Sequence, residues 1–246
     1  MDLFKFLFLT LIDKYAKPDT IDFSEGSVIF FDKPEGLTSF DIIRRIRRII
    51  KIKKIGHAGT LDPLATGLMI LCTGKMTKKI NLYQGMEKVY EGMMYLGAST
   101  ASYDRETPVL AQYDLSGIDH KKLYDEVKNF RGEIEQIPPL YSALKVDGVR
   151  LYKKAHRGEH AEIKSRKVFV HEFEITGIDL PYLNFFVRCS KGTYIRSLAH
   201  DFGKALNAGA YLFSLRRVKI GDYHVKDAIN FELLNEYLKK CEIKSL

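Results

Sequence analysis

Residues 56–67 of this 246-residue chain read Gly56-His57-Ala58-Gly59-Thr60-Leu61-Asp62-Pro63-Leu64-Ala65-Thr66-Gly67. The stretch places one carboxylate, that of Asp62, in a loop with little other side-chain bulk. Glycines permit backbone conformations that other residues rarely adopt, and Pro63 stiffens the chain directly after the aspartate. An isolated Asp-Pro pair in such a loop is more often an ordinary turn. The rest of the chain favours the other interpretation, a loop shaped so that a substrate can approach a reactive carboxylate.

Further motifs lie on both sides of this loop. Together with residues 57–67 they resemble, in the same order, the motifs of the TruB-type tRNA pseudouridine synthases. Several long motifs in one order, from about Ser27 to about Ile229, are not expected by chance. The motifs are Asp32-Lys33-Pro34-Glu35-Gly36-Leu37-Thr38-Ser39, Lys88-Val89-Tyr90, Pro138-Pro139-Leu140-Tyr141-Ser142-Ala143-Leu144-Lys145, Cys189-Ser190-Lys191-Gly192-Thr193-Tyr194-Ile195-Arg196 and Leu215-Arg216-Arg217.

The resemblance implies a reaction and a set of site residues. Enzymes of this family convert the T-loop uridine of tRNA, position 55, into pseudouridine, and the match puts Asp62 at the position of the nucleophile. Tyr90 matches a tyrosine that stacks on the uracil, and it is a candidate proton acceptor. Tyr194 and Leu215 match residues that line the uracil pocket. His57 matches a residue that contacts the flipped nucleotide.

Arg196 is also unusual on physical grounds. It falls in the first turn of a predicted helix, where the helix dipole disfavours a cation by a few tenths of a kcal/mol. We therefore expect an anionic group beside it, and the resemblance implies a salt bridge to Asp62 that keeps this carboxylate ionised. Lys33 matches a lysine near the active site of the family, and we count it among the candidate substrate-binding residues. Asp104 resembles an acidic position of the family, but its neighbours are less typical, so we leave it outside the catalytic set.

Composition sets the class of protein. Lysine and arginine number 39 against 31 aspartates and glutamates, giving a formal net charge of +8, and 46% of the residues are hydrophobic. This content supports a sizeable core, and the charge suits a polyanion such as RNA, although many basic proteins use charge only for solubility. Cys72, Cys189 and Cys241 match neither a disulfide framework nor a zinc site, so we expect a reducing cytoplasm.

Residues 1–23 form an N-terminal extension that the resemblance does not cover. Leu3 to Ile12 is largely apolar, but Asp2 and Lys5 do not suit a secretory signal, and the stretch is too short to span a bilayer. We expect a helix packed on the domain and no membrane association.

Periodicity predicts α+β structure for the remainder, residues 24–246. Strands are expected at 27–31, 68–72, 89–97, 166–178 and 183–189, and helices at 75–83 and 118–130 and from Thr38, Thr193 and Asp227. Tyr90 and Gly92 share one face of their strand, which predicts space in front of the Tyr90 ring. The helix from Thr38 carries an arginine stripe that either grips phosphates or is merely solvated. The family fold is similar: a mixed, largely antiparallel sheet flanked by helices.

Residues 138–167 mix basic and aromatic side chains around an Asp147-Gly148 turn, as expected of a protruding hairpin. In the family, this region is an insertion that clamps the tRNA stem-loop. About thirty residues follow Arg217, which we expect to form a strand, a helix and a tail and not a PUA domain. Binding of the T-arm is then expected to rely on the insertion and the basic faces.

The reaction moves one glycosidic bond from N1 to C5 of uracil, so we expect neither a cofactor nor a metal. A metal hydrolase is disfavoured because His57 and Asp62 have no nearby HxH or second acidic cluster. Two alternatives stay open: a related synthase for another RNA, such as the guide-dependent dyskerin relatives, and a non-catalytic module that binds or folds RNA. The resemblance further implies a monomer.

Overall fold

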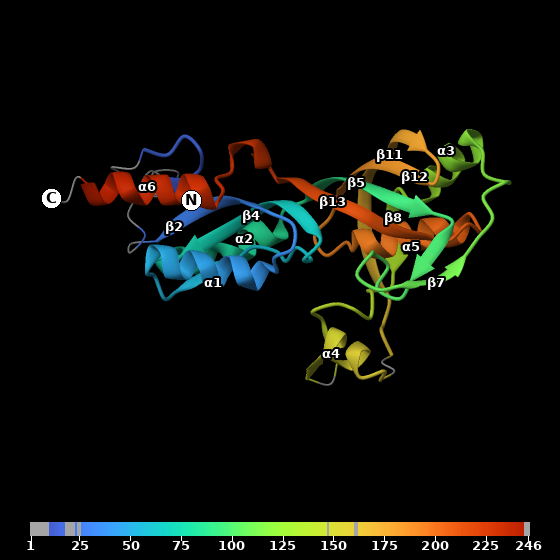
Figure 1. Ribbon diagram of the computed structural model, residues 1–246, viewed down its shortest axis with the longest axis horizontal. Helices are drawn as coiled ribbons and strands as arrows, with labels where there is room; N and C mark the ends of the chain where they lie inside the picture. The colour runs from blue at the N-terminus through green and yellow to red at the C-terminus, as the bar shows by residue number, and fades with distance from the viewer. Residues whose placement is uncertain (1–9, 18–22, 24–25, 147, 160–161, 244–246) are drawn as a thin grey trace. The chain divides into compact units, whose positions relative to one another are not determined.

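The computed structural model describes residues 10–17, 23, 26–146, 148–159 and 162–243 (Figure 1). The chain divides into two compact units. The first unit is built from the chain up to Lys88 and from Arg216 onward, and the second from Val89 to Leu215. The predicted domain boundaries stay a prediction.

In the first unit, strands surround the predicted Asp62 loop. Strand β2 pairs antiparallel with β4, so that Lys33 lies opposite Gly67, and β3 also pairs antiparallel with β4. The elements are β1 (Thr10–Ile12), β2 (Ser27–Lys33), α1 (Ser39–Ile50), β3 (Ile55–His57), β4 (Ala65–Thr73), η3 (Gly74–Lys79), α2 (Ile80–Gly85), β14 (Tyr223–His224), η4 (Val225–Asp227) and α6 (Phe231–Ile243). The strand predicted at 68–72 is confirmed, and that at 27–31 continues to Lys33. The helix predicted at 75–83 begins instead as the 3₁₀ segment η3.

Helix α1 begins as its sequence predicts. The Thr38 hydroxyl accepts a hydrogen bond from the backbone N–H of Asp41, and the Asp41 carboxylate accepts one from the backbone N–H of Thr38. This capping box satisfies two backbone donors that a helix start leaves unpaired. One face buries Ile42, Ile43, Ile46 and Ile50, while the arginines of the opposite face are exposed.

The ends of the chain differ from our expectation. Where the extension is described, Thr10–Ile12 is a strand parallel to β2 and not a helix, while residues 1–9 lie outside the described part. The Tyr237 hydroxyl donates to the carbonyl of Asp13 at 3.2 Å, which ties the extension to α6. Helix α6 begins at Phe231 and not at Asp227, because the Asn230 side chain caps it by accepting from the N–H of Leu233.

The second unit packs helices against long antiparallel strands. Strands β11 and β12 confirm the two predicted at 166–178 and 183–189, and the rings of Phe173, Phe185 and Phe202 meet edge to face beside them. The elements are β5 (Lys88–Leu96), β6 (Ala98–Thr100), β7 (Val109–Gln112), α3 (His120–Asn129), β8 (Gly132–Gln136), β9 (Lys145–Val146), β10 (Val149–Arg150), α4 (Leu151–His156), β11 (Arg166–Asp179), β12 (Tyr182–Cys189), α5 (Ile195–Ala205) and β13 (Ala210–Ile220). Strand β5 begins in the first unit and β13 ends there.

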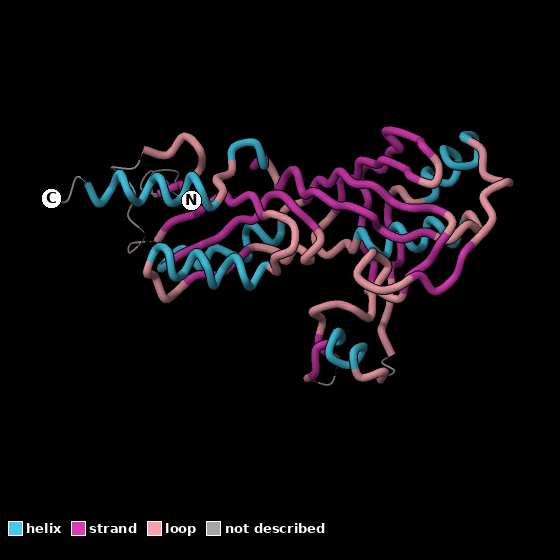
Figure 2. Tube along the Cα trace, in the orientation of Figure 1, coloured by secondary structure: helices cyan, strands magenta, loops and turns pink. Residues whose placement is uncertain are grey.

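The predicted insertion contains a small hairpin followed by a helix. Val146 pairs with Val149, so two residues separate the antiparallel strands β9 and β10, which is the spacing of a tight hairpin. Gly148 has a φ of +77°, and Asp147 lies outside the described residues. Figure 2 shows this hairpin and α4 joined to the rest of the chain by two loop segments.

The strands follow the order β1-β2-β4-β13-β5-β12-β11-β8, with β3 paired to β4 and β14 to β13. Strands β1 and β2 are parallel, whereas β2–β4, β3–β4, β8–β11 and β11–β12 are antiparallel. The expectation of α+β structure with a mixed, largely antiparallel sheet flanked by helices is confirmed.

Candidate active site

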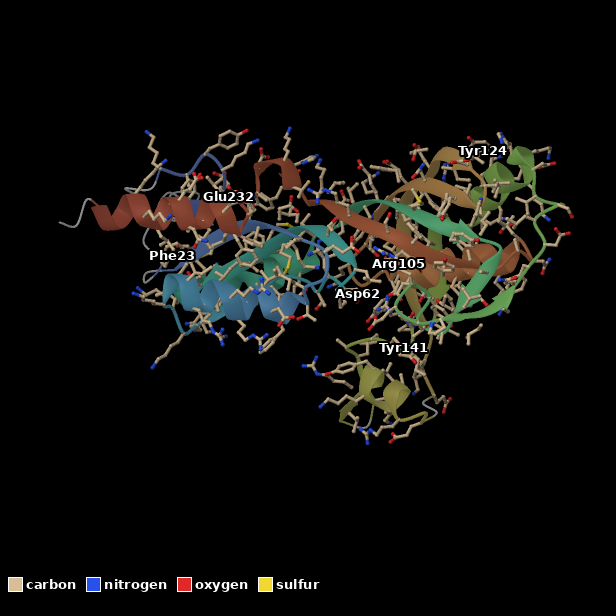
Figure 3. All side chains as sticks on the ribbon, viewed as in Figure 1. Phe23, Asp62, Arg105, Tyr124, Tyr141 and Glu232 are labelled. Carbon is tan, nitrogen blue, oxygen red and sulfur yellow. The ribbon has the colours of Figure 1, made fainter. Side chains whose placement is uncertain are left out.

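Asp62 lies in the turn that joins β3 to β4 (Figure 3). The two strands hold the turn at its base, where His57 pairs with Leu71 and the N–H of Ala58 donates to the carbonyl of Ile70. The N–H of Ala65 donates back to the carbonyl of Asp62 at 3.1 Å. The Asp62 side chain is half-buried, which suits a carboxylate that must be reached by a substrate.

Ser39 holds the residue that precedes Asp62. Its hydroxyl donates to the carbonyl of Leu61 at 2.9 Å and accepts from the N–H of Leu61 at 2.8 Å. Both residues are buried, so neither group is exposed to competing water. Because Ser39 is the first residue of α1, the capping box of that helix also fixes one side of the Asp62 turn.

Lys33 holds the residue that follows Asp62. Its side chain is fully buried, and its ammonium group donates to the carbonyls of Pro34, Leu37 and Pro63 at 2.9, 2.6 and 3.2 Å. Burial lowers the pKa of Lys33 to about 8, while the negative charge of Asp62 acts in the opposite direction. We predicted that Lys33 binds substrate; that role stays a prediction, and these contacts describe a residue that positions the loop.

Arg217 holds the two ends of the turn from inside the unit. Its guanidinium group donates to the carbonyls of Gly59, Thr60 and Leu68, and the residue is 1% exposed. The backbone of Arg217 also approaches Gly67 so closely that a Cβ there would lie 2.3 Å from the Arg217 carbonyl oxygen. Glycine is therefore required at position 67, where φ is also +104°.

His57 lies at the end of β3 beside this network. Burial lowers the pKa of His57, a backbone hydrogen bond at Gly59 acts in the opposite direction, and the charge of Arg217 lowers it further. The imidazole is therefore mostly neutral at pH 7, and it can stack on or donate to a base without carrying a charge.

In the second unit, Arg196 lies in the first turn of α5, as predicted, and it is 3% exposed. Its guanidinium donates to the carbonyls of Ser102 and Tyr141 at 3.0 and 2.9 Å, and its Nε lies 3.6 Å from the carboxylate of Asp104. The anionic neighbour that the helix dipole led us to expect is therefore present in Asp104. The predicted salt bridge between Arg196 and Asp62 stays a prediction.

Asp104 is itself fixed by its own loop. One carboxylate oxygen accepts from the Ser102 hydroxyl at 2.5 Å and from the N–H of Glu106 at 2.9 Å, while the other faces Arg196. The residue is 4% exposed, so a buried charge pair is formed. Sequence reasoning left Asp104 outside the site; the signal that could have found it was the need for an acid beside Arg196.

Tyr194 precedes α5 and is held by two neighbours. The Gln136 side chain accepts from its N–H at 2.7 Å and donates to its carbonyl at 2.9 Å. The guanidinium of Arg166 lies 4.6 Å from the centre of its ring. We expected Thr193 to begin this helix, but the Thr193 hydroxyl donates to the carbonyl of Ser190, and Tyr194 stands at the cap.

Tyr90 and Leu215 are both buried, on β5 and β13 respectively, with 8% and 9% of their surface exposed. A Cβ on Gly92 would lie 2.6 Å from Phe185 and from the carbonyl oxygen of Ser214. Because Gly92 has no side chain, the Phe185 ring can lie directly against it. Space in front of the Tyr90 ring stays a prediction, but the missing side chain of Gly92 does not supply it.

The predicted site residues thus fall into two groups. The first unit contains Asp62, His57 and Lys33, and the second contains Tyr90, Tyr194, Arg196 and Leu215. Their roles stay predictions. Within the described ranges, no three histidine, cysteine or acidic side chains are grouped as metal ligands would be. The same ranges contain no helix with the length and apolar character needed to cross a bilayer.

Comparison with known proteins identifies strong similarities along the chain. Residues 47–195 match the model of the TruB family pseudouridylate synthase N-terminal domain, and residues 196–245 match that of the tRNA pseudouridylate synthase B C-terminal domain. The chain is 52% identical to tRNA pseudouridine synthase B of Flavobacterium johnsoniae, over 89% of this chain and 98% of that protein. It is 45% identical to the Phocaeicola vulgatus protein of the same name, over 92% and 99% of the two chains.

Solved structures show the same fold at lower identity. A chain in the crystal structure of a Cbf5-Nop10-Gar1 complex superposes with a TM-score of 0.71 at 28% identity, over 96% of this chain and 61% of that one. A chain in the structure of an H/ACA RNP bound to a substrate RNA containing 2′-deoxyuridine gives 0.68 at 26% identity, over 93% and 59%. The present chain therefore spans about three fifths of these structural relatives.

Proposed function

Because the chain belongs to the TruB family of pseudouridine synthases, we propose that it uses Asp62 as the nucleophile that isomerises the T-loop uridine, position 55, of tRNA. The chain is a tRNA pseudouridine synthase, which is an isomerase that binds RNA. The observation that supports the proposal for Asp62 is its turn, since Ser39 holds the preceding residue and Lys33 the following one.

The reaction explains why such a turn is useful. The bond between N1 and C1′ of the uridine must break, the base must rotate, and C5 must join C1′. A carboxylate is needed to form or stabilise the intermediate, and it must be held within a fraction of an ångström of its productive place. In the Asp62 turn, backbone contacts supply this restraint and leave the carboxylate half-buried. We assign Lys33 and Arg217 to positioning this turn.

In the second unit, Tyr90, Tyr194 and Leu215 are proposed to line the pocket for the uracil, and Arg196 to pair with Asp62. The buried Asp104 carboxylate holds the Arg196 guanidinium in one orientation. His57 is proposed to contact the flipped nucleotide in its neutral form. No cofactor or metal is required, because the same atoms are present before and after the reaction.

The base must leave its stack before it reaches Asp62, which costs a few kcal/mol that binding to the surrounding RNA must offset. Residues 44–54 supply seven exposed cations and no acid, namely Arg44, Arg45, Arg47, Arg48, Lys51, Lys53 and Lys54. We propose that this segment, named the α1 basic segment, and the insertion at 138–167 bind the T-arm phosphates. The enzyme is proposed to act as a monomer in the cytoplasm.

The decisive experiment compares the wild type with Asp62→Asn on unmodified tRNA, with pseudouridine mapped by carbodiimide primer extension. We expect modification at the T-loop uridine by the wild type and none by the variant, with tRNA binding retained. Asp222→Asn, which removes an exposed carboxylate of the same unit, is the control and should be fully active. Modification that persists in Asp62→Asn would exclude Asp62 as the nucleophile, and a wild type that binds tRNA without modifying it would favour a non-catalytic RNA-binding module.

A further inference from the structure

Tyr103 adopts an unusual backbone conformation in the loop between β6 and β7. Its φ is +62°, in the left-handed region that costs a residue with a Cβ about 1–2 kcal/mol. Its carbonyl accepts from the N–H of Leu212 at 2.9 Å, and its ring stacks on that of His200, with 3.8 Å between the ring centres and 13° between the planes. Contacts of the residue must offset the backbone cost, and the stack is one of them.

The two neighbours of Tyr103 both contact Arg196. The carbonyl of Ser102 accepts from its guanidinium at 3.0 Å, and the carboxylate of Asp104 lies 3.6 Å from its Nε. His200 follows Arg196 by four residues, so both side chains lie on one face of α5. Three consecutive loop residues therefore contact one helix face, with Ser102 and Asp104 at Arg196 and Tyr103 one turn further along.

We propose that Tyr103 is a positioning residue, whose stack on His200 fixes the loop 102–104 against α5 and thereby sets the orientation of the Arg196 guanidinium. The inference rests on the proposed function, in which Arg196 pairs with the nucleophile. Without the Tyr103 ring, Ser102 and Asp104 keep the groups that contact Arg196, but the loop loses the contact that fixes its position along α5. Arg196 then has more than one orientation.

The stack joins two neutral rings. Burial lowers the pKa of His200, as does the charge of Lys204, and burial raises the pKa of Tyr103, as does the charge of Asp201. Within the described chain, the Nδ1 atom of His200 is buried without a hydrogen-bond partner. Contact with the Tyr103 ring, and not a hydrogen bond at Nδ1, therefore holds the His200 imidazole. Another flat ring at position 200 should make the same contact.

The experiment uses substitutions that separate the ring from the backbone. Tyr103→Gly removes the ring but suits a positive φ, so the loop backbone is not strained. Tyr103→Phe and His200→Phe keep a stack of two rings, and His200→Ala removes it. Asn207→Gly, at another positive φ in the same unit, is the control for backbone relief. Single-turnover pseudouridine formation, the dissociation constant for tRNA and the melting temperature are measured for each variant.

We expect Tyr103→Gly and His200→Ala to lower the single-turnover rate about tenfold or more, since small misplacements of catalytic groups have effects of this size. Their tRNA affinity should stay within about twofold, and the double variant should be no slower than either single one. Both phenylalanine variants and Asn207→Gly should match the wild type. Wild-type rates in Tyr103→Gly, or a His200→Phe variant as slow as His200→Ala, would overturn the inference. An inactive wild type would instead overturn the proposed function.

Discussion

The side-chain nitrogen of Lys33 lies 3.2 Å from the carbonyl oxygen of Pro63, the residue that directly follows Asp62. Together with two further carbonyl contacts, this places a buried cation behind the turn that presents the proposed nucleophile. The charge acts on the backbone of the turn as well as on its carboxylate. The loop therefore depends on a lysine that the sequence motif alone suggests as a substrate ligand.

Replacement of Lys33 by methionine should destabilise the protein and slow catalysis more than it weakens tRNA binding. Three carbonyls lose their donor, and each unsatisfied buried group costs about 1–3 kcal/mol. The variant no longer buries a charge, which offsets part of this loss. We expect a net loss of about 2–4 kcal/mol in the free energy of unfolding, measured in urea. Lys226→Met, at an exposed lysine of the same unit, should have no measurable effect.

Lys33 should also make stability depend on pH in a defined direction. Its pKa is lowered from 10.5 to about 8 in the folded state, so between these values the unfolded chain retains a proton that the folded chain has lost. Stability therefore rises with pH across this window, by up to about 1.4 kcal/mol for each unit of difference in pKa. The advantage of the wild type over Lys33→Met should be larger at pH 10 than at pH 7. An equal difference at the two values would show that Lys33 keeps its ordinary pKa.

The pair formed by Asp104 and Arg196 should be strongly coupled. Both residues are less than 5% exposed, and removal of one partner leaves a buried charge, which typically costs about 3–5 kcal/mol. We expect Asp104→Asn and Arg196→Met each to be strongly destabilising and the double variant to cost clearly less than their sum. The same cycle on the exposed Lys167–Glu133 pair is the control and should show little coupling. Additive losses at the buried pair would contradict its assignment as a pair.

The α1 basic segment should contribute to the salt dependence of tRNA binding. If Arg47 and Arg48 each contact a phosphate, the variant Arg47→Gln/Arg48→Gln should reduce the slope of log K against log salt by about 1–2. Its single-turnover rate at saturating enzyme should be unchanged. Lys121→Gln/Lys122→Gln on α3 removes the same charge from the second unit and should leave the slope as it is. An unchanged slope in the α1 variant would mean that the arginines are merely solvated.

Local patterns predicted the elements of this fold well. The capping box of Thr38 and Asp41, the isoleucine spacing of α1 and the alternation in β11 and β12 all depend on neighbouring residues, which a sequence displays directly. The structure departs from these patterns where contacts between residues that are distant in sequence decide the local arrangement. Thr10–Ile12 became a strand because β2 offers a free edge, and the space beside Gly92 is filled by Phe185 from another strand.

The site shows the same division. Motifs singled out Asp62 and Arg196 as candidates, but they did not show that Ser39, Lys33 and Arg217 hold the Asp62 turn through its backbone. Any residue can accept such a hydrogen bond through its backbone carbonyl. These contacts therefore impose no sequence pattern on the residues around Asp62. Asp104 was left outside the predicted site for a related reason. Its partner, Arg196, lies 92 residues further along the chain.

The two ends of the insertion lie side by side on adjacent strands. Gln136 and Arg166 are paired in register between β8 and β11, and both contact Tyr194, one through its backbone and the other over its ring. The Ser197 hydroxyl adds a bond to the carbonyl of Ile137. The segment also contributes to the site, because the Tyr141 carbonyl accepts from the buried Arg196 guanidinium at 2.9 Å. The part beyond Tyr141 can therefore vary in length or sequence while the sheet and the start of α5 keep their geometry. If this part binds the T-arm, as proposed, a chimaera that carries a relative's residues there should change RNA preference more than it changes the single-turnover rate.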